Sequence, residues 1–298
     1  MTSPSRFPLG LLCALSAFFM WGALPLYWKL LQAQAPMEIF YHRTLWSMVF
    51  LSIILLVGKP FDALKQLILS PRAMINALVS TVLIGGNWLL YIWAVTSDHV
   101  IETSLGYYLS PLVSILLGTV FLQEKLRKAQ WIAVGFATFG VALLTAQLGA
   151  VPWIALSLAT TFSLYGFLKK FLSLDAGIRL WFETLALTIG LVIYGWLTPE
   201  AVHTTAFWGY VPHVQLLLIG AGLVTAMPMW CYGYASRALP LSTLGFLQYL
   251  APTMQLLLGI FIFHESFTRS HFFAFMSIWL AIALFVGDSL RSWKRSRL

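Results

Sequence analysis

Apolar stretches of about twenty residues alternate with short polar breaks from one end of the chain to the other. A run of that length crosses the ~30 Å hydrocarbon core of a bilayer as an α-helix. The breaks carry turn-forming and charged residues, such as GKPFD at 58–62 and QEKLRK at 123–128. The pattern predicts ten transmembrane helices, over residues 8–30, 39–58, 73–96, 101–122, 129–147, 152–169, 178–197, 213–236, 242–263 and 271–290.

Composition predicts an all-α polytopic membrane protein and excludes a soluble domain. Of the 298 residues, 60% are hydrophobic and 9% are charged, whereas a soluble domain carries about 25% charged residues. The segments are also too long for barrel strands. The first run, from Pro8 to Leu31, exceeds the apolar region of a signal peptide, and no small-residue cleavage site follows it. Cys13 and Cys231 lie in apolar segments, which predicts packed thiols and no disulfide framework.

The distribution of basic residues tests the count of ten helices. With ten spans, fifteen of the eighteen Lys and Arg residues fall on one side of the membrane, and only Lys29, Arg43 and Arg269 fall on the other. Cytoplasmic loops carry such an excess, so both termini are predicted to be cytoplasmic, in a bacterial-type inner membrane. The net charge of +8 is explained by this topology, and no nucleic-acid partner is expected.

An internal repeat divides the chain into halves of five helices, residues 1–148 and 149–298. The segment SLGYYLSPLVSILLGTVFLQE at 104–124 matches TLGFLQYLAPTMQLLLGIFIFHE at 243–265, once two residues are inserted after the first glycine. Because five is odd, the second half must be inverted relative to the first. Inverted repeats are typical of transporters, in which two opposed halves exchange inward- and outward-facing shapes around a site near the midplane.

The sequence resembles a known transporter family. A proline, an apolar stretch and a closing Glu in the fourth and ninth helices resemble the EamA repeat of the drug/metabolite transporter superfamily. IGGNWLLYIWAV at 84–95, SLGYYLSP, YHRTLWS and STLGFLQYLAPT resemble its RarD branch, the so-called chloramphenicol-sensitive proteins. The resemblance covers roughly residues 8–290. It implies a ten-helix permease with a central cavity lined mainly by helices one, three, four, six, eight and nine. The superfamily moves amino acids, nucleotide sugars, small amines and drugs, so the resemblance leaves the substrate open.

Asn87 is the leading candidate for a solute contact, because it lies near the middle of the third apolar segment. Polar groups inside a membrane tend to face transport pathways, and Trp88 and Tyr91 lie deep enough in the same helix to stack on a solute. The alternative is that Asn87 only joins two helices, through a hydrogen bond worth about 0.6–2 kcal/mol.

Further candidates lie on four other helices. Tyr108 in the fourth helix, and Gln248 and Tyr249 in the ninth, are predicted to form rims of a pathway; interfacial packing is the alternative. Trp21 and Trp230 sit deep in the first and eighth helices, each near a proline that can kink its helix and act in gating, Pro25 and Pro228.

Charged residues divide into coupling candidates and structural anchors. His42, Arg43 and Glu102 are candidates for gating or proton coupling, with Glu38, Asp98 or Glu102 as the expected partner of Arg43. Glu124 and Glu265 close their helices at the C-terminal end, where a negative charge opposes the helix dipole. They therefore require cationic or N–H partners, and they are predicted to anchor neighbouring helices. The histidines match no zinc motif, and no cofactor or metal is expected.

The sequence favours a secondary permease that moves a small organic solute by alternating access through an aromatic-lined cavity. An intramembrane enzyme is disfavoured because the chain has no H-E-x-x-H, G-x-S-x-G or phosphate-binding glycine loop. A receptor or scaffold without transport is the alternative, although nothing about it requires two opposed halves. The expected partners are the solute and the lipid bilayer, and the residues leave a homodimer open.

Overall fold

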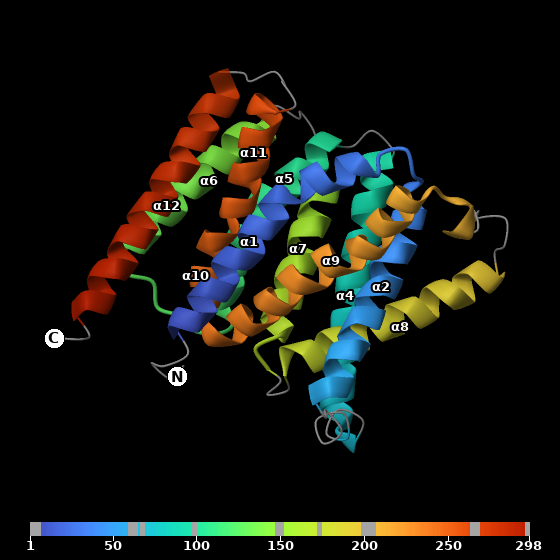
Figure 1. Ribbon diagram of the computed structural model, residues 1–298. Coiled ribbons are helices and arrows are strands. Elements are labelled where there is room, and N and C mark those ends of the chain that lie inside the picture. Colours follow the sequence, from blue (N-terminus) through green and yellow to red (C-terminus); the bar gives the residue numbers. More distant parts are fainter. Residues whose placement is uncertain are drawn as a thin grey trace.

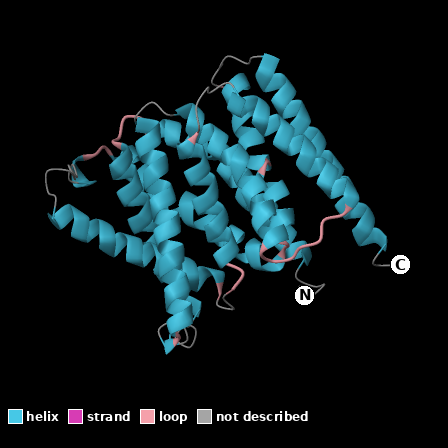
Figure 2. Ribbon diagram, turned by 180° about the vertical axis from the view of Figure 1, so that it is seen from behind, coloured by secondary structure: helices cyan, strands magenta, loops and turns pink. Residues whose placement is uncertain are grey.

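The structure is a computed structural model, and it describes residues 7–58, 65, 69–96, 100–146, 152–171, 175–197, 207–262 and 269–295. Every regular element in these ranges is a helix (Figures 1 and 2). The elements are α1 (Phe7–Leu30), α2 (Pro36–Gly58), α4 (Pro71–Thr96), α5 (Val100–Val120), α6 (Lys128–Ala146), α7 (Trp153–Leu168), α8 (Ala176–Leu197), the 3₁₀ turn η1 (Phe207–Gly209), α9 (Pro212–Ala238), α10 (Leu241–Gln248), α11 (Leu250–Phe261) and α12 (Arg269–Arg295).

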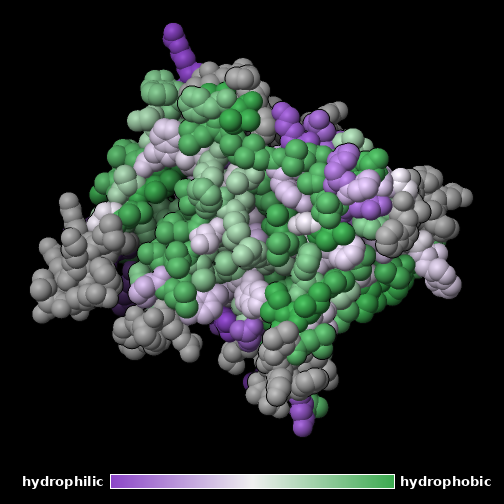
Figure 3. All heavy atoms as spheres, in the orientation of Figure 1, coloured by the Kyte–Doolittle hydropathy of each residue, from purple (hydrophilic) through white to green (hydrophobic). Residues whose placement is uncertain are grey.

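The bundle is a multi-pass membrane protein. Six helices are long and apolar enough to cross a bilayer: α1, α2, α4, α6, α8 and α9; shorter apolar stretches lie at Leu105–Val120, Trp153–Leu168 and Phe272–Asp288. The face in Figure 3 is mostly hydrophobic over the helices. Large apolar side chains such as Phe19, Val82 and Trp196 are exposed on the surface, as is expected of a surface in contact with lipid.

Proline sets several helix boundaries. Pro36, Pro71 and Pro212 are the first residues of α2, α4 and α9, where a missing N–H removes no helical hydrogen bond. A helix starts beside proline at two other places, where Pro152 and Pro240 precede α7 and α10.

The ninth predicted span is two helices, because α10 ends at Gln248 and α11 begins at Leu250. Pro252 lies four residues after Gln248 and has no N–H to donate to its carbonyl group. The chain therefore changes helix at Tyr249, in the middle of an apolar stretch.

Several helix contacts form matched pairs when α1, α2, α4, α5 and α6 are compared with α7, α8, α9, the pair α10–α11 and α12. Helices at the same position of these two sets touch directly in three cases, α2 with α8, α5 with α10, and α6 with α12. Other contacts come in matched pairs: α1–α9 with α4–α7, α2–α9 with α4–α8, and α5–α7 with α1–α11. The start of α1 and the end of α12 lie at one end of the bundle (Figure 1), called here the terminus end; the opposite end is the far end.

The pair α6–α12 forms one edge of the bundle (Figure 1). A Cβ atom on Gly140 of α6 would lie 2.7 Å from the carbonyl oxygen of Ala274, so the two backbones meet closely there. Ser277 donates a hydrogen bond to the carbonyl oxygen of Phe136 at 2.8 Å. These contacts hold α6 directly against α12.

The start of α10 is capped from another helix. The Glu124 carboxylate accepts hydrogen bonds from the backbone N–H groups of Leu241 (2.6 Å) and Ser242 (2.9 Å), and from the Ser242 hydroxyl (2.6 Å). A carboxylate there meets unpaired N–H groups and the positive end of the helix dipole. The prediction that Glu124 anchors neighbouring helices is confirmed, and Glu265 lies outside the described residues.

A buried ion pair joins α8 to the end of α7. The Lys169 ammonium lies 2.7 Å from the Glu183 carboxylate, and their side chains are 3% and 1% exposed. The Tyr165 hydroxyl donates to the same carboxylate at 2.9 Å, and Arg179 donates to the Lys169 carbonyl oxygen at 2.8 Å. Neither charge of the pair reaches solvent, so each depends on the other.

Removing one partner of this pair should destabilise the protein far more than removing both. Glu183→Leu should lower the free energy of unfolding by about 3–5 kcal/mol, because it leaves the Lys169 charge buried without its carboxylate. The double variant Lys169→Met/Glu183→Leu should lose much less. Thermal melting in detergent measures both, and a double variant that melts as early as the single one would contradict the interpretation.

A central cavity as the candidate solute site

A cavity of about 160 Å³ lies among α1, α2, α4, α5, α7, α9, α10 and α11. Five of its lining residues come from α1, at Phe18, Trp21, Leu24, Pro25 and Trp28, and one comes from α2, Arg43. The others are Asn87, Trp88, Tyr91, Thr103, Gly106, Tyr107, Ser110, Leu158, Phe162, Thr225, Met229, Gln248, Ala251, Pro252 and Gln255. The lining therefore comes from the six helices that the family resemblance implies, namely α1, α4, α5, α7, α9 and the pair α10–α11. The second helix, α2, adds Arg43.

The structure brings seven of the predicted residues into this lining: Trp21, Pro25, Arg43, Asn87, Trp88, Tyr91 and Gln248. Five others lie outside it: His42, Tyr108, Pro228, Trp230 and Tyr249. The side chain of Glu102 lies outside the described residues.

Helical geometry explains why neighbours of lining residues point elsewhere. On α5 the cavity face is Thr103, Gly106, Tyr107 and Ser110, which have the i, i+3, i+4, i+7 spacing of one helical face. Tyr108 is turned about 100° from Tyr107, and its hydroxyl donates to the Pro252 carbonyl oxygen at 3.1 Å.

The same turn of about 100° between adjacent residues explains which predicted residues of α9 and α2 face the cavity. Thr225 and Met229 of α9, four residues apart, line the cavity, whereas Trp230 lies against Gly177 of α8. His42 packs against Phe207, with ring centroids 5.4 Å apart, while Arg43 faces the cavity.

The position of Asn87 agrees with both interpretations, a residue that lines the cavity and a residue that joins two helices. It lines the cavity, and its amide nitrogen donates to the Leu158 carbonyl oxygen and the Thr161 hydroxyl of α7, each at 2.9 Å. Two acceptors fix the nitrogen on the α7 side. The amide oxygen accepts no hydrogen bond from the described residues, and a solute contact through it stays a prediction.

Pro25 shapes the cavity wall by freeing a carbonyl group. Pro25 has no N–H to donate to the carbonyl oxygen of Trp21, four residues earlier in α1. The Gln255 amide of α11 donates to that oxygen instead, at 3.1 Å. A helix–helix contact therefore replaces the lost helical hydrogen bond, which is how membrane helices tolerate proline.

Arg43 lies over aromatic rings. Its guanidinium carbon is 4.2 Å from the Trp88 ring centroid and 5.6 Å from that of Trp28. The prediction of Glu38 as its partner is wrong: no ion pair joins them in the described structure, and one carboxylate oxygen of Glu38 is itself buried without a partner there. The other two expected partners, Asp98 and the Glu102 side chain, lie outside the described residues.

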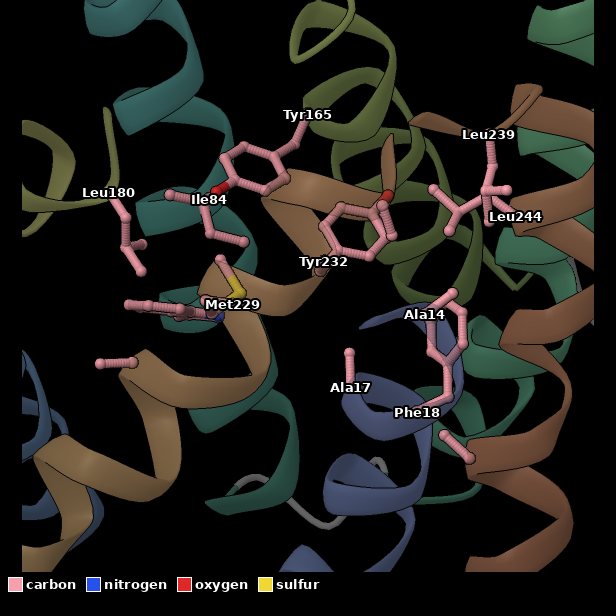
Figure 4. Close-up of a cluster of buried hydrophobic side chains, with 14 of the residues drawn as sticks. Ala14, Ala17, Phe18, Ile84, Tyr165, Leu180, Met229, Tyr232, Leu239 and Leu244 are labelled. Atoms are coloured by element: carbon pink, nitrogen blue, oxygen red, sulfur yellow. The ribbon is translucent and has the colours of Figure 1, made fainter. Parts of the chain in front are cut away.

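An aromatic cluster surrounds Trp21 at the cavity wall. Trp21 contacts Phe18, Phe162 and Tyr232 with ring centroids 5.5–5.7 Å apart, and Tyr165 stacks on Tyr232 at 6.4 Å. Figure 4 shows Phe18, Tyr165 and Tyr232 converging from α1, α7 and α9. Tyr165 also bonds Glu183, so the aromatic cluster connects the cavity to the buried ion pair.

Three polar atoms in the lining have no hydrogen-bond partner in the described structure. They are Arg43 Nε, Thr225 Oγ1 and Gln248 Oε1, from α2, α9 and α10. Buried polar groups are almost always paired, and these three lie on residues around one cavity; others, such as Ser80 Oγ and Tyr249 Oη, lie on residues outside the described lining. Sequence reasoning missed Thr225 because a lone Thr in an apolar helix usually bonds its own backbone.

The described residues hold no cluster of three or more His, Cys, Asp or Glu side chains that could bind a metal ion. Cys13 and Cys231 are both free thiols. The chemistry of the site is therefore carried by aromatic rings, amides, hydroxyls and one guanidinium group.

Comparisons with known proteins agree with this architecture. The model of the "EamA-like transporter family" matches residues 8–146. The chain is similar to the "Protein RarD" of Escherichia coli (strain K12), with 41% identity over 96% of this chain and 97% of that protein. It is also similar to an "Uncharacterized transporter" of Vibrio cholerae, with 40% identity over 97% and 95%. A solved structure described as "Crystal structure of protein" has the same fold, with a TM-score of 0.71, 18% identity, and coverage of 97% of this chain and 99% of that one.

The hydrogen bonds of Asn87 predict a graded loss of stability. Asn87→Ala should lower the free energy of unfolding by about 1–2 kcal/mol, because two interhelical hydrogen bonds are lost. Thr161→Val should lose about half as much, because it removes only one of the two interhelical hydrogen bonds of Asn87. Melting curves in detergent compare the two variants with the wild type, and an Asn87→Ala variant as stable as the wild type would show that the amide does not bind α7.

Proposed function

The chain belongs to the EamA-like transporter family, in its RarD branch, and on that premise we propose that it is a secondary permease for a small organic solute. In this proposal the two halves, residues 1–148 and 149–298, form an inverted repeat that exposes the central cavity alternately to the two sides of the membrane. The terminus end faces the cytoplasm of a bacterial-type cell, as the excess of Lys and Arg there favours.

One observation carries the proposal: Arg43, Thr225 and Gln248, which line one cavity from three separate helices, each hold a buried polar atom without a partner in the described structure. A scaffold gains nothing from orphan polar atoms, since each costs free energy that a hydrogen bond would recover. A transport site uses polar side chains that are not already paired, because the solute must exchange its bonds with water for bonds with the protein.

The proposed solute contacts are the predicted residues that line the cavity. Asn87 and Gln248 provide amides, whereas Trp21, Trp88 and Tyr91 provide aromatic surface. Pro25 keeps its proposed role in gating, because the Trp21 carbonyl group that it frees is held by Gln255 of another helix.

An asymmetry between the halves supports alternating access. Tyr108 and Tyr249 occupy matching positions of the repeat, but Tyr108 donates to the Pro252 carbonyl oxygen, while the buried Tyr249 hydroxyl has no partner in the described structure. Pro111, the counterpart of Pro252, lies close to α10, since a Cβ atom on Gly245 would be 2.8 Å from the Pro111 carbonyl oxygen. If the halves exchange roles, Tyr249 gains a bond to Pro111 and Tyr108 loses its own.

A blocked cavity tests the proposal. The wild-type protein is screened in detergent against amino acids, organic acids, nucleosides, polyamines and amphenicol drugs, because a ligand that binds only the folded state raises the melting temperature. A compound that binds is then assayed for flux into liposomes. Ala251→Trp, which fills the cavity, should abolish both the shift and the flux.

The matched control is Gly135→Trp, which adds the same ring at an exposed position of α6 with no atom within 4 Å of a new Cβ. It should bind and transport as the wild type does. Flux that survives Ala251→Trp would place the pathway elsewhere, and binding without any flux would favour a receptor.

The two tyrosines should respond differently to loss of the hydroxyl group. Tyr108→Phe should lower the free energy of unfolding by about 1 kcal/mol, the worth of one hydrogen bond. Tyr249→Phe should leave the stability unchanged or raise it, because it removes an unsatisfied buried hydroxyl. Both should slow flux, since each biases the balance between the two states. Equal losses of stability in the two variants, measured by melting, would argue against the exchange.

A further inference from the structure

Arg43 is the only charged residue among the described residues that line the cavity. It sits two turns into α2, near the far end, and Trp88 and Tyr91 from the last turns of α4 line the cavity beside it. Its position places a positive charge on this part of the cavity wall.

The guanidinium is held by rings and not by a described carboxylate. Trp88 and Trp28 lie under its face, and its Nε atom is buried without an acceptor. The edge of a guanidinium group carries the N–H donors that fit a carboxylate or phosphate. A buried charge without a hydrogen-bonding partner raises the free energy of the folded protein. A bound anion supplies both the opposite charge and the hydrogen-bond acceptors.

A cationic solute is disfavoured at the same place. Aromatic cavities bind ammonium groups through the faces of their rings, but here the Arg43 cation already lies over one face of Trp88 and one face of Trp28. A second positive charge beside it would be repelled strongly, since the interior screens charges poorly.

The size of the cavity limits the rest of the solute. A cavity of about 150 Å³ holds one benzene molecule, and this one is about 160 Å³. Trp21 and Phe162 supply apolar surface for a ring-sized body, and the Gln248 and Thr225 orphans supply polar contacts on other walls.

We propose that the solute carries an anionic group, a carboxylate or phosphate, which Arg43 binds, on a body about as large as one aromatic ring. The inference rests on the proposed function, because it assumes that the cavity binds what the protein moves. It assigns Arg43 to recognition of the solute's charge.

Three probes of one shape test the charge preference: benzoate, benzamide and benzylamine. Calorimetric titration of the purified full-length protein in detergent should show benzoate binding at least tenfold more tightly than the other two. Arg43→Gln should abolish that preference while melting close to the wild type. Arg43→Lys should retain only part of it, because lysine keeps the charge and loses the planar group of donors.

Two further variants complete the test. Arg127→Gln, the control, removes an exposed positive charge that pairs with Asp288 away from the cavity, and should leave benzoate binding unchanged. Glu102→Gln should also bind benzoate within twofold of the wild type. A tenfold gain there would mean that Glu102 already neutralises Arg43, and this would overturn the inference.

Other outcomes separate the inference from the proposed function. If benzamide or benzylamine binds as tightly as benzoate, and Ala251→Trp abolishes that binding, the cavity is a solute site and the charge inference alone is wrong. If benzoate binding survives both Arg43→Gln and Ala251→Trp, it occurs outside the cavity and overturns the inference. If neither these probes nor the solute panel binds the wild type, both proposals fail.

Discussion

Every polar group inside the bilayer must find its partner within the protein, and this constraint organises the whole bundle. Most polar side chains in the structure obey it by joining helices. Glu124 caps α10, Lys169 neutralises Glu183, and Gln255 takes the carbonyl group that Pro25 leaves free. Against that background the polar atoms that remain unpaired in the described structure stand out, and three of them, on Arg43, Thr225 and Gln248, belong to residues that line the cavity.

The helices could be read from the sequence because hydrophobicity decides what enters the membrane. Each predicted span coincides with a helix or, for 242–263, with the pair α10 and α11. That break follows from Pro252, but its position inside an apolar stretch hid it from a search based on length and hydropathy.

The lining of the cavity was predicted only in part, for a physical reason. In a soluble helix polarity marks the outer face, whereas here the lipid face, the helix contacts and the cavity wall are all apolar. Hydropathy therefore cannot distinguish Tyr107 from Tyr108, or Met229 from Trp230, although adjacent residues point about 100° apart. Asn87 and Gln248 could be found because an amide is conspicuous in such surroundings. The stacking of Arg43 on Trp88 joins two helices distant in sequence, and only the tertiary structure reveals it.

The α6–α12 edge has a mechanical consequence. Neither helix contributes a residue to the described lining of the cavity, and the close approach at Gly140 leaves little room for their backbones to slide. If the contacts of this edge persist through the proposed alternating access, the cavity opens by a rotation about an axis along the edge, which then acts as a hinge. The displacement then grows with distance from the hinge, so α2, α4 and α8, which lie on the other side of the bundle in Figure 1, travel farthest.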